Sequence, residues 1–243
     1  MDAFTMQIAG LSVRVEPMFG STREYCRPYL TEKQPEMVVT VTPHDLAYEQ
    51  EMAEQEAVEE GLRIRKFTEP FLERATIQRA VARELISRDT LLFHGSTVAV
   101  DGEAYIFTAA CRVGKSTHTG YWRELFGSRA VMVNDDKPFL QLTSDGVLAY
   151  GSPWTGKHGL GNNVCFPLKG ICFLRRGQEN KICRLSPQDC MAALLHQSFL
   201  PDEDREKAVS LVEALAERIP LWEMECTKDI SAAQIAYDAM SNE

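Results

Sequence analysis

One stretch near the middle of the chain, residues 104–117, constrains the fold more than any other. It begins with the apolar run Tyr105-Ile-Phe107, which predicts a buried strand, and it ends in Val113-Gly-Lys-Ser-Thr117 before a helical pattern. A strand, a tight turn and a helix that opens with Gly-Lys-Ser form a phosphate cradle, because backbone N–H groups at the helix start point at the anion. In such a loop the lysine contacts the outer phosphates and the serine hydroxyl holds Mg²⁺. Ala109 stands where the full pattern has its first glycine, so the match is partial.

The composition excludes several classes of function. The 243 residues suit one large α/β domain, or one domain with a small appendage. A formal net charge of −9 argues against a duplex nucleic-acid binder, which needs a basic face to replace counterions. No apolar run approaches a membrane span, and no signal region begins the chain. Seven cysteines without a C-x-x-C pair predict reduced thiols in a cytoplasmic protein.

The hydrophobic pattern predicts alternating strands and helices. Strands are expected at 6–15, 37–42, 90–94, 96–100, 104–109, 130–134, 139–142, 147–150, 170–174 and 221–226. Helices are expected at 49–60, 69–86, 115–126, 187–199, 203–219 and 231–240. We therefore expect an α/β domain around a mixed, strongly twisted sheet at residues 66–243, with residues 1–65 as a small β-rich appendage.

Two adjacent acids, Asp135 and Asp136, follow an apolar strand about twenty residues beyond Lys115. A phosphate-loop fold places there the carboxylate that orients Mg²⁺, although two acids can also form an ordinary turn. Adjacent carboxylates tend to have separated pKa values, so one can take a proton while the other stays on the metal. His94 is either a satisfied core histidine or a neighbour of this pair, and Lys137 is placed to neutralise the acids.

Cations elsewhere in the chain are weaker candidates for the site. Residues 151–163 contain four glycines and form no core of their own, which predicts a functional loop. Lys157 in that loop is placed either to clamp a transferring phosphoryl group or simply to be solvated. Arg175 and Arg176 end a strand, and one of them is a candidate to face the site.

Five segments in a fixed order carry a resemblance to a known family. They are His94-Gly-Ser96, residues 107–117, Asp135-Asp136, Gly151-Ser-Pro153 and residues 167–177. In this order the chain resembles the HPr kinase/phosphorylase family, and within it the short HPr-kinase-like proteins, some of which phosphorylate peptides. That family shares its nucleotide fold with phosphoenolpyruvate carboxykinase. The resemblance therefore implies an HPr-kinase-like core with a phosphate loop, which binds ATP and Mg²⁺ and transfers a phosphoryl group to a hydroxyl.

The resemblance also implies roles for single residues. Asp135 would be the general base with His94 beside it, and Lys115 would meet the β- and γ-phosphates. Mg²⁺ would be held by Ser116 and Asp136. The residues expected to contact the nucleotide are Arg112, Val113, Gly114, Lys115, Ser116, Thr117 and Lys157. The acceptor would be a serine of a peptide or protein, or a small hydroxylated molecule, with no role for nucleic acid or membrane and with a homo-oligomer left open.

Departures from the family loop leave two functions open. The family pattern is G-x-S-G-x-G-K-[ST], whereas Ala109, Cys111 and Arg112 replace its first glycine, its serine and its second glycine. Holding a non-glycine residue at positive φ costs ~1–2 kcal/mol, which corresponds to about ten- to thirty-fold in affinity. The chain is therefore expected to be an ATP-dependent kinase or, alternatively, a non-catalytic ATP-binding pseudokinase or regulatory protein.

Overall fold

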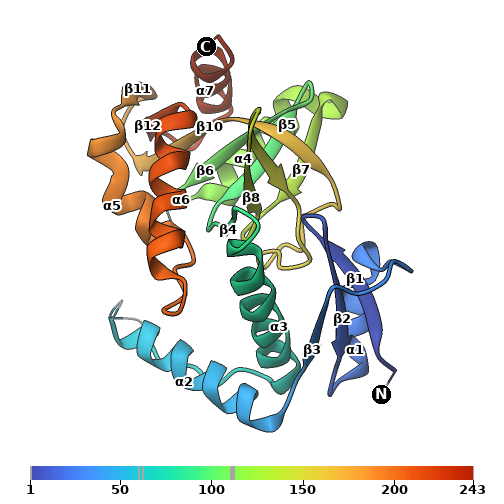
Figure 1. Ribbon diagram of the computed structural model, residues 1–243. Coiled ribbons are helices and arrows are strands. Elements are labelled where there is room, and N and C mark those ends of the chain that lie inside the picture. Colours follow the sequence, from blue (N-terminus) through green and yellow to red (C-terminus); the bar gives the residue numbers. More distant parts are fainter. Residues whose placement is uncertain (1, 60, 62, 110–112, 243) are drawn as a thin grey trace. The chain divides into compact units, whose positions relative to one another are not determined.

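The computed structural model describes residues 2–59, 61, 63–109 and 113–242. The chain divides into two compact units, Met1–Glu84 and Leu85–Glu243 (Figure 1). The boundary expected from the sequence, at residues 65–66, lies before the helix in which this division falls. Within the described ranges, no helix combines the length and the apolar character needed to cross a membrane.

The first unit contains a three-stranded sheet of β1 (Phe4–Ile8), β2 (Leu11–Glu16) and β3 (Met37–Thr40). β1 and β2 are antiparallel, and β3 is parallel to β2. The sequence predicted one bent strand over residues 6–15. The bend is instead a complete reversal at Ala9–Gly10, because both residues adopt positive φ, 45° and 85°, as the tightest hairpin turns require.

A buried carboxylate holds the first unit together. Glu73 is fully buried and accepts hydrogen bonds from the backbone N–H groups of Met18 and Phe19 and from the hydroxyl of Thr22. A charged group without water is stable only when it is hydrogen-bonded in this way. The helices of this part of the chain are α1 (Gly20–Tyr25), the 3₁₀ turn η1 (Arg27–Tyr29), α2 (Pro43–Glu59) and α3 (Glu69–Ile86).

The second unit is built on a mixed sheet that contains nine strands among the described residues. Their order is β4-β8-β9-β10-β6-β5-β7, and β12 pairs with β10 and β11. β10 is antiparallel to β9 and parallel to both β6 and β12, which confirms the mixed α/β sheet. The strands are β4 (Thr90–Leu92), β5 (Ser96–Val100), β6 (Glu103–Thr108), β7 (Ala130–Asn134), β8 (Phe139–Thr143), β9 (Gly146–Tyr150), β10 (Cys165–Arg176), β11 (Lys181–Leu185) and β12 (Leu221–Cys226).

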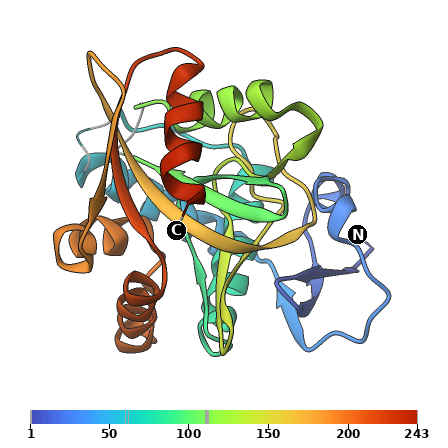
Figure 2. The same cartoon turned by 90° about the horizontal axis from the view of Figure 1, so that it is seen from above.

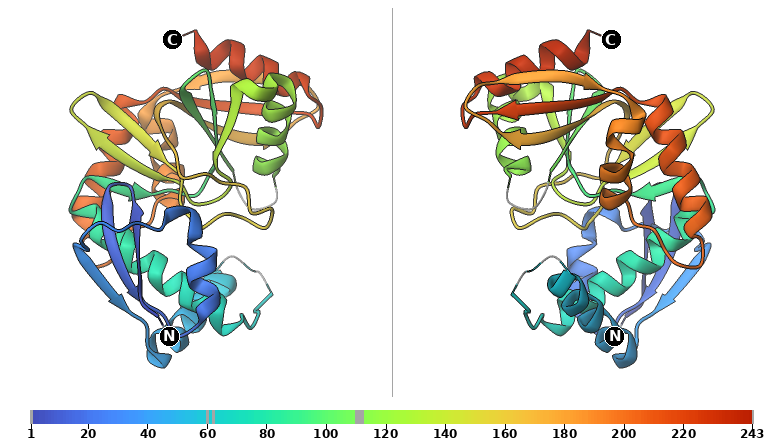
Figure 3. Two further views of the ribbon diagram at one scale, coloured as in Figure 1. Left: turned by 90° about the vertical axis from the view of Figure 1, so that its right-hand side faces the viewer. Right: turned by 90° about the vertical axis from the view of Figure 1, so that its left-hand side faces the viewer.

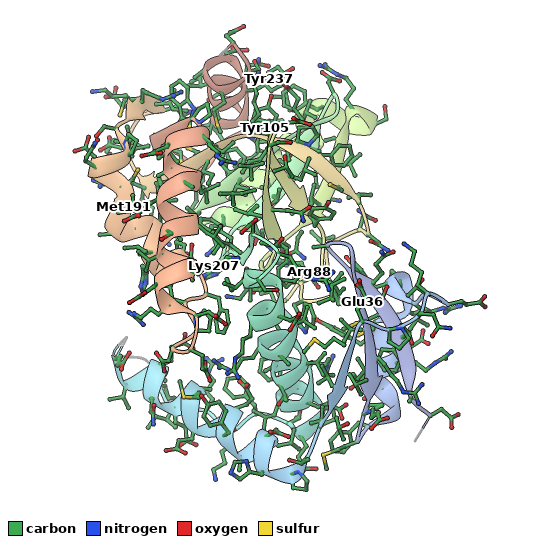
Figure 4. All side chains as sticks on the ribbon, in the orientation of Figure 1. Glu36, Arg88, Tyr105, Met191, Lys207 and Tyr237 are labelled. Atoms are coloured by element: carbon green, nitrogen blue, oxygen red, sulfur yellow. The ribbon has the colours of Figure 1, made fainter. Side chains whose placement is uncertain are left out.

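Helices cover both faces of this sheet (Figures 2 and 3). Tyr105 and Phe107 of β6 pack with residues of α4 and α7, whereas Ala104 and Ile106 pack in the core that α5 and α6 supply. Tyr105 lies beside Tyr237 of α7, with ring centroids 6.1 Å apart (Figure 4). Both faces of β6 are thus buried, which explains its continuous apolar sequence. The helices are α4 (Lys115–Phe126), α5 (Pro187–Gln197), α6 (Arg205–Arg218) and α7 (Ser231–Ser241).

Local signals predicted most of these boundaries. The bounds of α3, α4 and β7 match those expected from spacing and flanking residues. Ser186 caps α5 as predicted, because its Oγ accepts from the Asp189 N–H at 3.3 Å. β11 was missed, since it pairs only with β12 among the described strands and leaves most of its side chains at least partly exposed.

Candidate functional site

The start of α4 lies at the carboxyl edge of β6. Gly114 is the N-cap residue of α4 and has a φ of 125°. Because glycine has no side chain, it offers no side-chain hydrogen bond to the N–H groups of the first turn. A backbone angle of this kind favours glycine. Ser116 is half-buried and Thr117 is exposed. Arg112, a predicted nucleotide contact, and Cys111, which replaces the serine of the family loop, lie outside the described residues.

Ala109 carries less strain than the sequence suggested. It is 6% exposed, and the non-glycine residues with positive φ in the described part of the chain are Ala9, Asp89 and Asp101. Ala109 therefore has an ordinary φ. The conformational cost expected for a non-glycine residue here does not arise, which removes one of the three reasons to expect a weakened cradle.

Asn134 organises the turn that carries the two acids. Its Oδ1 accepts from the N–H groups of Asp136 at 2.8 Å and Lys137 at 2.6 Å. Its Nδ2 donates to the carbonyl and the hydroxyl oxygen of Ser152, both at 3.0 Å. Asn134 thus joins the turn to the glycine-rich loop at 151–163. Asn134 was not among the residues predicted for the site, although a buried polar residue that ends an apolar strand is a signal of such a role.

Asp135 is buried, with 3% of its surface exposed. Ser96 Oγ donates to Asp135 Oδ1 at 3.1 Å. Because the Ser96 proton is used in that bond, Ser96 accepts from Thr119 Oγ1, 2.8 Å away. Thr119 lies in α4, one turn beyond Lys115, so a chain of hydroxyls links the acid to the start of the helix. Asp135 Oδ2 is 3.3 Å from the place that a Cβ on Gly156 would occupy, so a glycine lets the loop backbone approach this carboxylate.

Asp136 has a different environment. His94 Nε2 is 3.3 Å from Asp136 Oδ1, so His94 lies beside the carboxylate pair. Burial is the largest influence on His94 and lowers its pKa, which keeps the imidazole neutral near pH 7 and makes it the donor. Burial alone would raise the pKa of Asp136, but the His94 hydrogen bond and the charges of Lys137 and Lys115 lower it below its usual range. Asp136 is therefore ionised in the folded protein.

The hydrogen bonds show which predicted residues come together. Asp135 is linked through Ser96 to Thr119 of α4, and the charge of Lys115 contributes to the lowered pKa of Asp136, so the start of α4 and the acid pair belong to one site. Lys157 is exposed next to the turn that Gly159 N–H and Gly156 O close at 3.0 Å. Among the described residues, no hydrogen bond or ion pair joins Lys157 to the acids.

A pocket of about 680 Å³ opens on the other side of β6. Ala109 and Val113, which flank the phosphate loop, form part of its wall, and Phe173 of β10 and Gln197 of α5 form another part. Arg175 and Arg176 also line it. The two arginines therefore lie at this pocket, next to the loop. No motif in the sequence pointed to Gln197.

Comparison with known proteins adds a distant likeness to a solved structure. No protein-family profile matches the chain, and no curated protein matches it. Among solved structures, the HPr(Ser) kinase/phosphatase from Coxiella burnetii is similar at a TM-score of 0.38 and 10% identity, over 62% of this chain and 94% of that one. A likeness at that TM-score does not define a function for this chain.

Proposed function

We propose that this chain is an ATP-dependent phosphotransferase. It would move the γ-phosphoryl group to the hydroxyl of a serine in a peptide or protein, or to that of a small hydroxylated molecule. The observation that supports this most is that the hydroxyls of Ser96 and Thr119 join Asp135 to α4, one turn beyond Lys115, while His94 lies 3.3 Å from the adjacent Asp136. A cation at a helix start, an ionised carboxylate and a second carboxylate are the groups that phosphoryl transfer needs.

The residues at the start of α4 fit a triphosphate. Gly114 has no side chain that could compete with a ligand for the N–H groups of the first turn, and such groups bind phosphate oxygens together with a lysine. Ser116 and Asp136 would hold Mg²⁺, which when bound neutralises charge on the phosphates. The lowered pKa of Asp136 suits it to this role, because the carboxylate stays ionised. Few protein ligands are needed, since Mg²⁺ keeps several waters and phosphate oxygens.

Asp135 would act as the general base. Its Oδ1 accepts from Ser96, which leaves Oδ2 to take the proton of the acceptor hydroxyl. Oδ2 faces Gly156 of the glycine-rich loop, so the acceptor hydroxyl would reach the acid beside that loop. Little covalent help is required beyond this alignment.

The alternative, a nucleotide-binding protein without transfer, rests on the altered loop. The ordinary φ of Ala109 weakens that reason, and two adjacent carboxylates next to His94 and α4 support transfer. We therefore favour a phosphotransferase. Binding of ATP without phosphoryl transfer would instead favour a non-catalytic nucleotide-binding protein.

An assay with γ-labelled ATP tests the proposal. The protein is incubated with a serine-containing peptide library or with a set of small alcohols, and transfer of the labelled phosphoryl group is measured. Lys115→Met is expected to lose both ATP binding and transfer. Lys181→Met, which alters an exposed lysine of β11, is the matched control and should behave as the native chain.

Two asparagine variants test the division of roles between the acids. Asp135→Asn should still bind Mg-ATP but transfer roughly 10²–10⁴-fold more slowly, the usual contribution of a general base. Asp136→Asn should instead weaken binding of ATP in a Mg²⁺-dependent way. A native transfer rate in Asp135→Asn would rule out Asp135 as the general base. If Asp135→Asn weakens ATP binding and Asp136→Asn slows transfer, Asp136 is the base and Asp135 is the Mg²⁺ ligand.

A further inference from the structure

The glycine-rich loop covers the acid that was assigned as general base. Asp135 is 3% exposed, and its Oδ1 accepts from Ser96. Gly156 lies against the other oxygen, since a Cβ at this position would be 3.3 Å from Asp135 Oδ2 and 3.5 Å from Asp136 Cβ. A general base has to come within ~2.6–3.2 Å of the group that gives up its proton. An acceptor hydroxyl therefore reaches Oδ2 only after Gly156 moves away.

Both ends of this loop are anchored to β7 or to the turn that follows it. At one end, Ser152 is fully buried, and its Oγ donates to the Lys137 carbonyl at 2.6 Å. At the other end, the Asn162 N–H donates to the Val133 carbonyl at 3.1 Å, and Asn162 Nδ2 donates to the Met132 carbonyl at 2.8 Å. Movement near Gly156 therefore does not require the ends of the loop to move.

Residues 155–159, which we call the loop tip, lie between these anchors. The Thr155 N–H donates to the Pro153 carbonyl at 2.9 Å, and the Gly159 N–H donates to the Gly156 carbonyl at 3.0 Å. Within the described residues, no hydrogen bond joins the loop tip to any other part of the chain, and its last three residues are exposed. A segment held by so few contacts opens at a low free energy, independently of the core.

We propose that the loop tip is a gate over the general base, an inference that rests on the function proposed above. The structure shows the gate closed, and the acceptor has to displace the loop tip before its hydroxyl reaches Asp135. The closed gate also keeps water from the base. Without an acceptor, attack of water on the γ-phosphorus, which would release ADP and phosphate, is therefore slow. The gate thus couples consumption of ATP to the presence of the acceptor.

A disulfide across the base of the loop tip tests this by locking the gate. A Cβ on Gly161 would lie 2.6 Å from Thr155 Cγ2, so cysteines at these two positions have the short separation that a disulfide needs. When oxidised, Thr155→Cys/Gly161→Cys should bind Mg-ATP as the native chain does. It should transfer roughly 10²-fold more slowly, because the base no longer reaches the acceptor. Reduction with dithiothreitol should restore transfer.

The control is the single variant Thr155→Cys, oxidised and reduced in the same way. The native chain already has seven cysteines, so this variant reports any effect of oxidation elsewhere, and it should transfer at the native rate in both states. Mass spectrometry of a proteolytic digest verifies the bond between positions 155 and 161. If that bond is present and the oxidised double variant transfers as fast as its reduced form, the gate is wrong.

A second pair of variants tests the gate by loosening it. The Leu160 side chain packs against the core beside α4 and α7, and its carbonyl accepts from the Asp135 N–H at 2.9 Å. Leu160→Ala should free the loop tip and raise hydrolysis of ATP several-fold when no acceptor is present. Leu125→Ala is the matched control, because it shortens a partly buried leucine of α4 that packs against the same core. It should leave hydrolysis at the native rate.

The possible failures are distinct. If the native chain neither binds Mg-ATP nor transfers phosphate, the proposed function is wrong and the gate falls with it. If the native chain transfers phosphate but hydrolyses ATP equally fast without an acceptor, only the gate is wrong. If the double variant does not fold, the leucine pair decides. Equal rates of hydrolysis in Leu160→Ala and Leu125→Ala would then overturn the gate.

Discussion

At the scale of single residues, buried hydroxyls explain how a carboxylate is held at the edge of an apolar sheet. Ser96 and Thr119 are at most 1% exposed. A hydroxyl buried without a partner is unfavourable, and these two bond to each other and to Asp135. Together the two hydroxyls stabilise the buried Asp135 carboxylate and fix the direction of its Oδ2 atom.

Ser96→Ala should therefore cost stability. It removes a hydrogen bond to a carboxylate, worth about 1.5–3 kcal/mol, and leaves Asp135 Oδ1 without that donor. Urea denaturation measures the change in the free energy of unfolding. Ser210→Ala is the control, since Ser210 lies exposed on α6 and donates only to the Glu206 carbonyl at 3.0 Å. Equal effects of the two substitutions would contradict the role given to Ser96.

A second prediction concerns acid stability. Burial lowers the pKa of His118 from 6.5 to about 4, so the unfolded chain binds a proton more readily than the folded one. Its contribution to stability is complete above pH 6.5 and is lost as the pH falls toward 4. From the linkage relation, the loss between pH 8 and pH 5 is about 2 kcal/mol. The lowered pKa of His94 acts in the same direction.

Comparison with His118→Gln isolates this effect. The amide keeps an acceptor for the Trp122 Nε1–H group, which His118 Nε2 accepts at 3.2 Å, but it does not titrate. Denaturant unfolding at pH 8 and pH 5 should show a smaller loss in the variant, by about 2 kcal/mol. An identical loss in both proteins would mean that His118 is not the source.

At the scale of elements, the glycine-rich loop shows why glycines recur near a site. A Cβ on Gly151 would lie 1.9 Å from the Asn162 carbonyl oxygen, and one on Gly161 would lie 2.6 Å from Thr155 Cγ2. The loop therefore folds back on itself at distances that only glycine allows. Gly156 brings the same loop against Asp135. Close packing, rather than conformational freedom, accounts for glycine at these positions.

Gly156→Ala tests whether the approach of the loop to Asp135 matters for function. The added methyl group would lie 3.3 Å from Oδ2, a tight but relievable contact, so the variant should fold. Transfer should fall by roughly tenfold, because misplacement of about 1 Å near reacting groups can cost up to 10²-fold. Measured transfer rates, with stability measured alongside, check this.

The matched control for that experiment lies in α4. Gly120 has open space where a Cβ would be, and alanine is favoured over glycine inside a helix by ~1 kcal/mol. Gly120→Ala should therefore raise stability and leave transfer unchanged. If both alanine variants lose transfer equally, the contact at Gly156 is not responsible.

At the scale of the whole molecule, binding should stabilise one unit selectively. Mg-ATP at about one hundred times its Kd adds ~2.7 kcal/mol to the state that binds it. The three tryptophans of the chain, Trp122, Trp154 and Trp222, all lie in the unit Leu85–Glu243. Thermal unfolding followed by tryptophan fluorescence therefore reports this unit, and its midpoint should rise with Mg-ATP.

Lys115→Met should lose that rise, whereas Lys181→Met should retain it. Both units contribute to the far-ultraviolet circular dichroism signal. The unfolding transition followed by this signal should respond less uniformly to Mg-ATP than the fluorescence transition, because a chain with two compact units need not unfold in one step. An unchanged fluorescence midpoint at millimolar Mg-ATP would argue against a nucleotide site at this loop.

Most helices and strands of this protein follow from short-range patterns in its sequence. Apolar spacing over residues 69–86 and the Gly114-Lys-Ser116 start predicted α3 and α4 with their bounds, and Asp101-Gly102 predicted a hairpin. Periodicity, caps and turns act between residues a few positions apart, so they can be read from neighbouring letters. The adjacent acids at the end of β7 were visible for the same reason.

Which side chains meet depends instead on contacts between distant parts of the chain. The bond from Ser96 to Asp135 spans 39 positions in the chain, and the backbone bond from His94 to Gln197 joins β4 and α5 regions that are farther apart still. Both depend on the strand order that places β5 between β6 and β7 and lays α5 beside β10. That order minimises exposed apolar surface over the entire sheet, a sum over distant residues that no local pattern encodes.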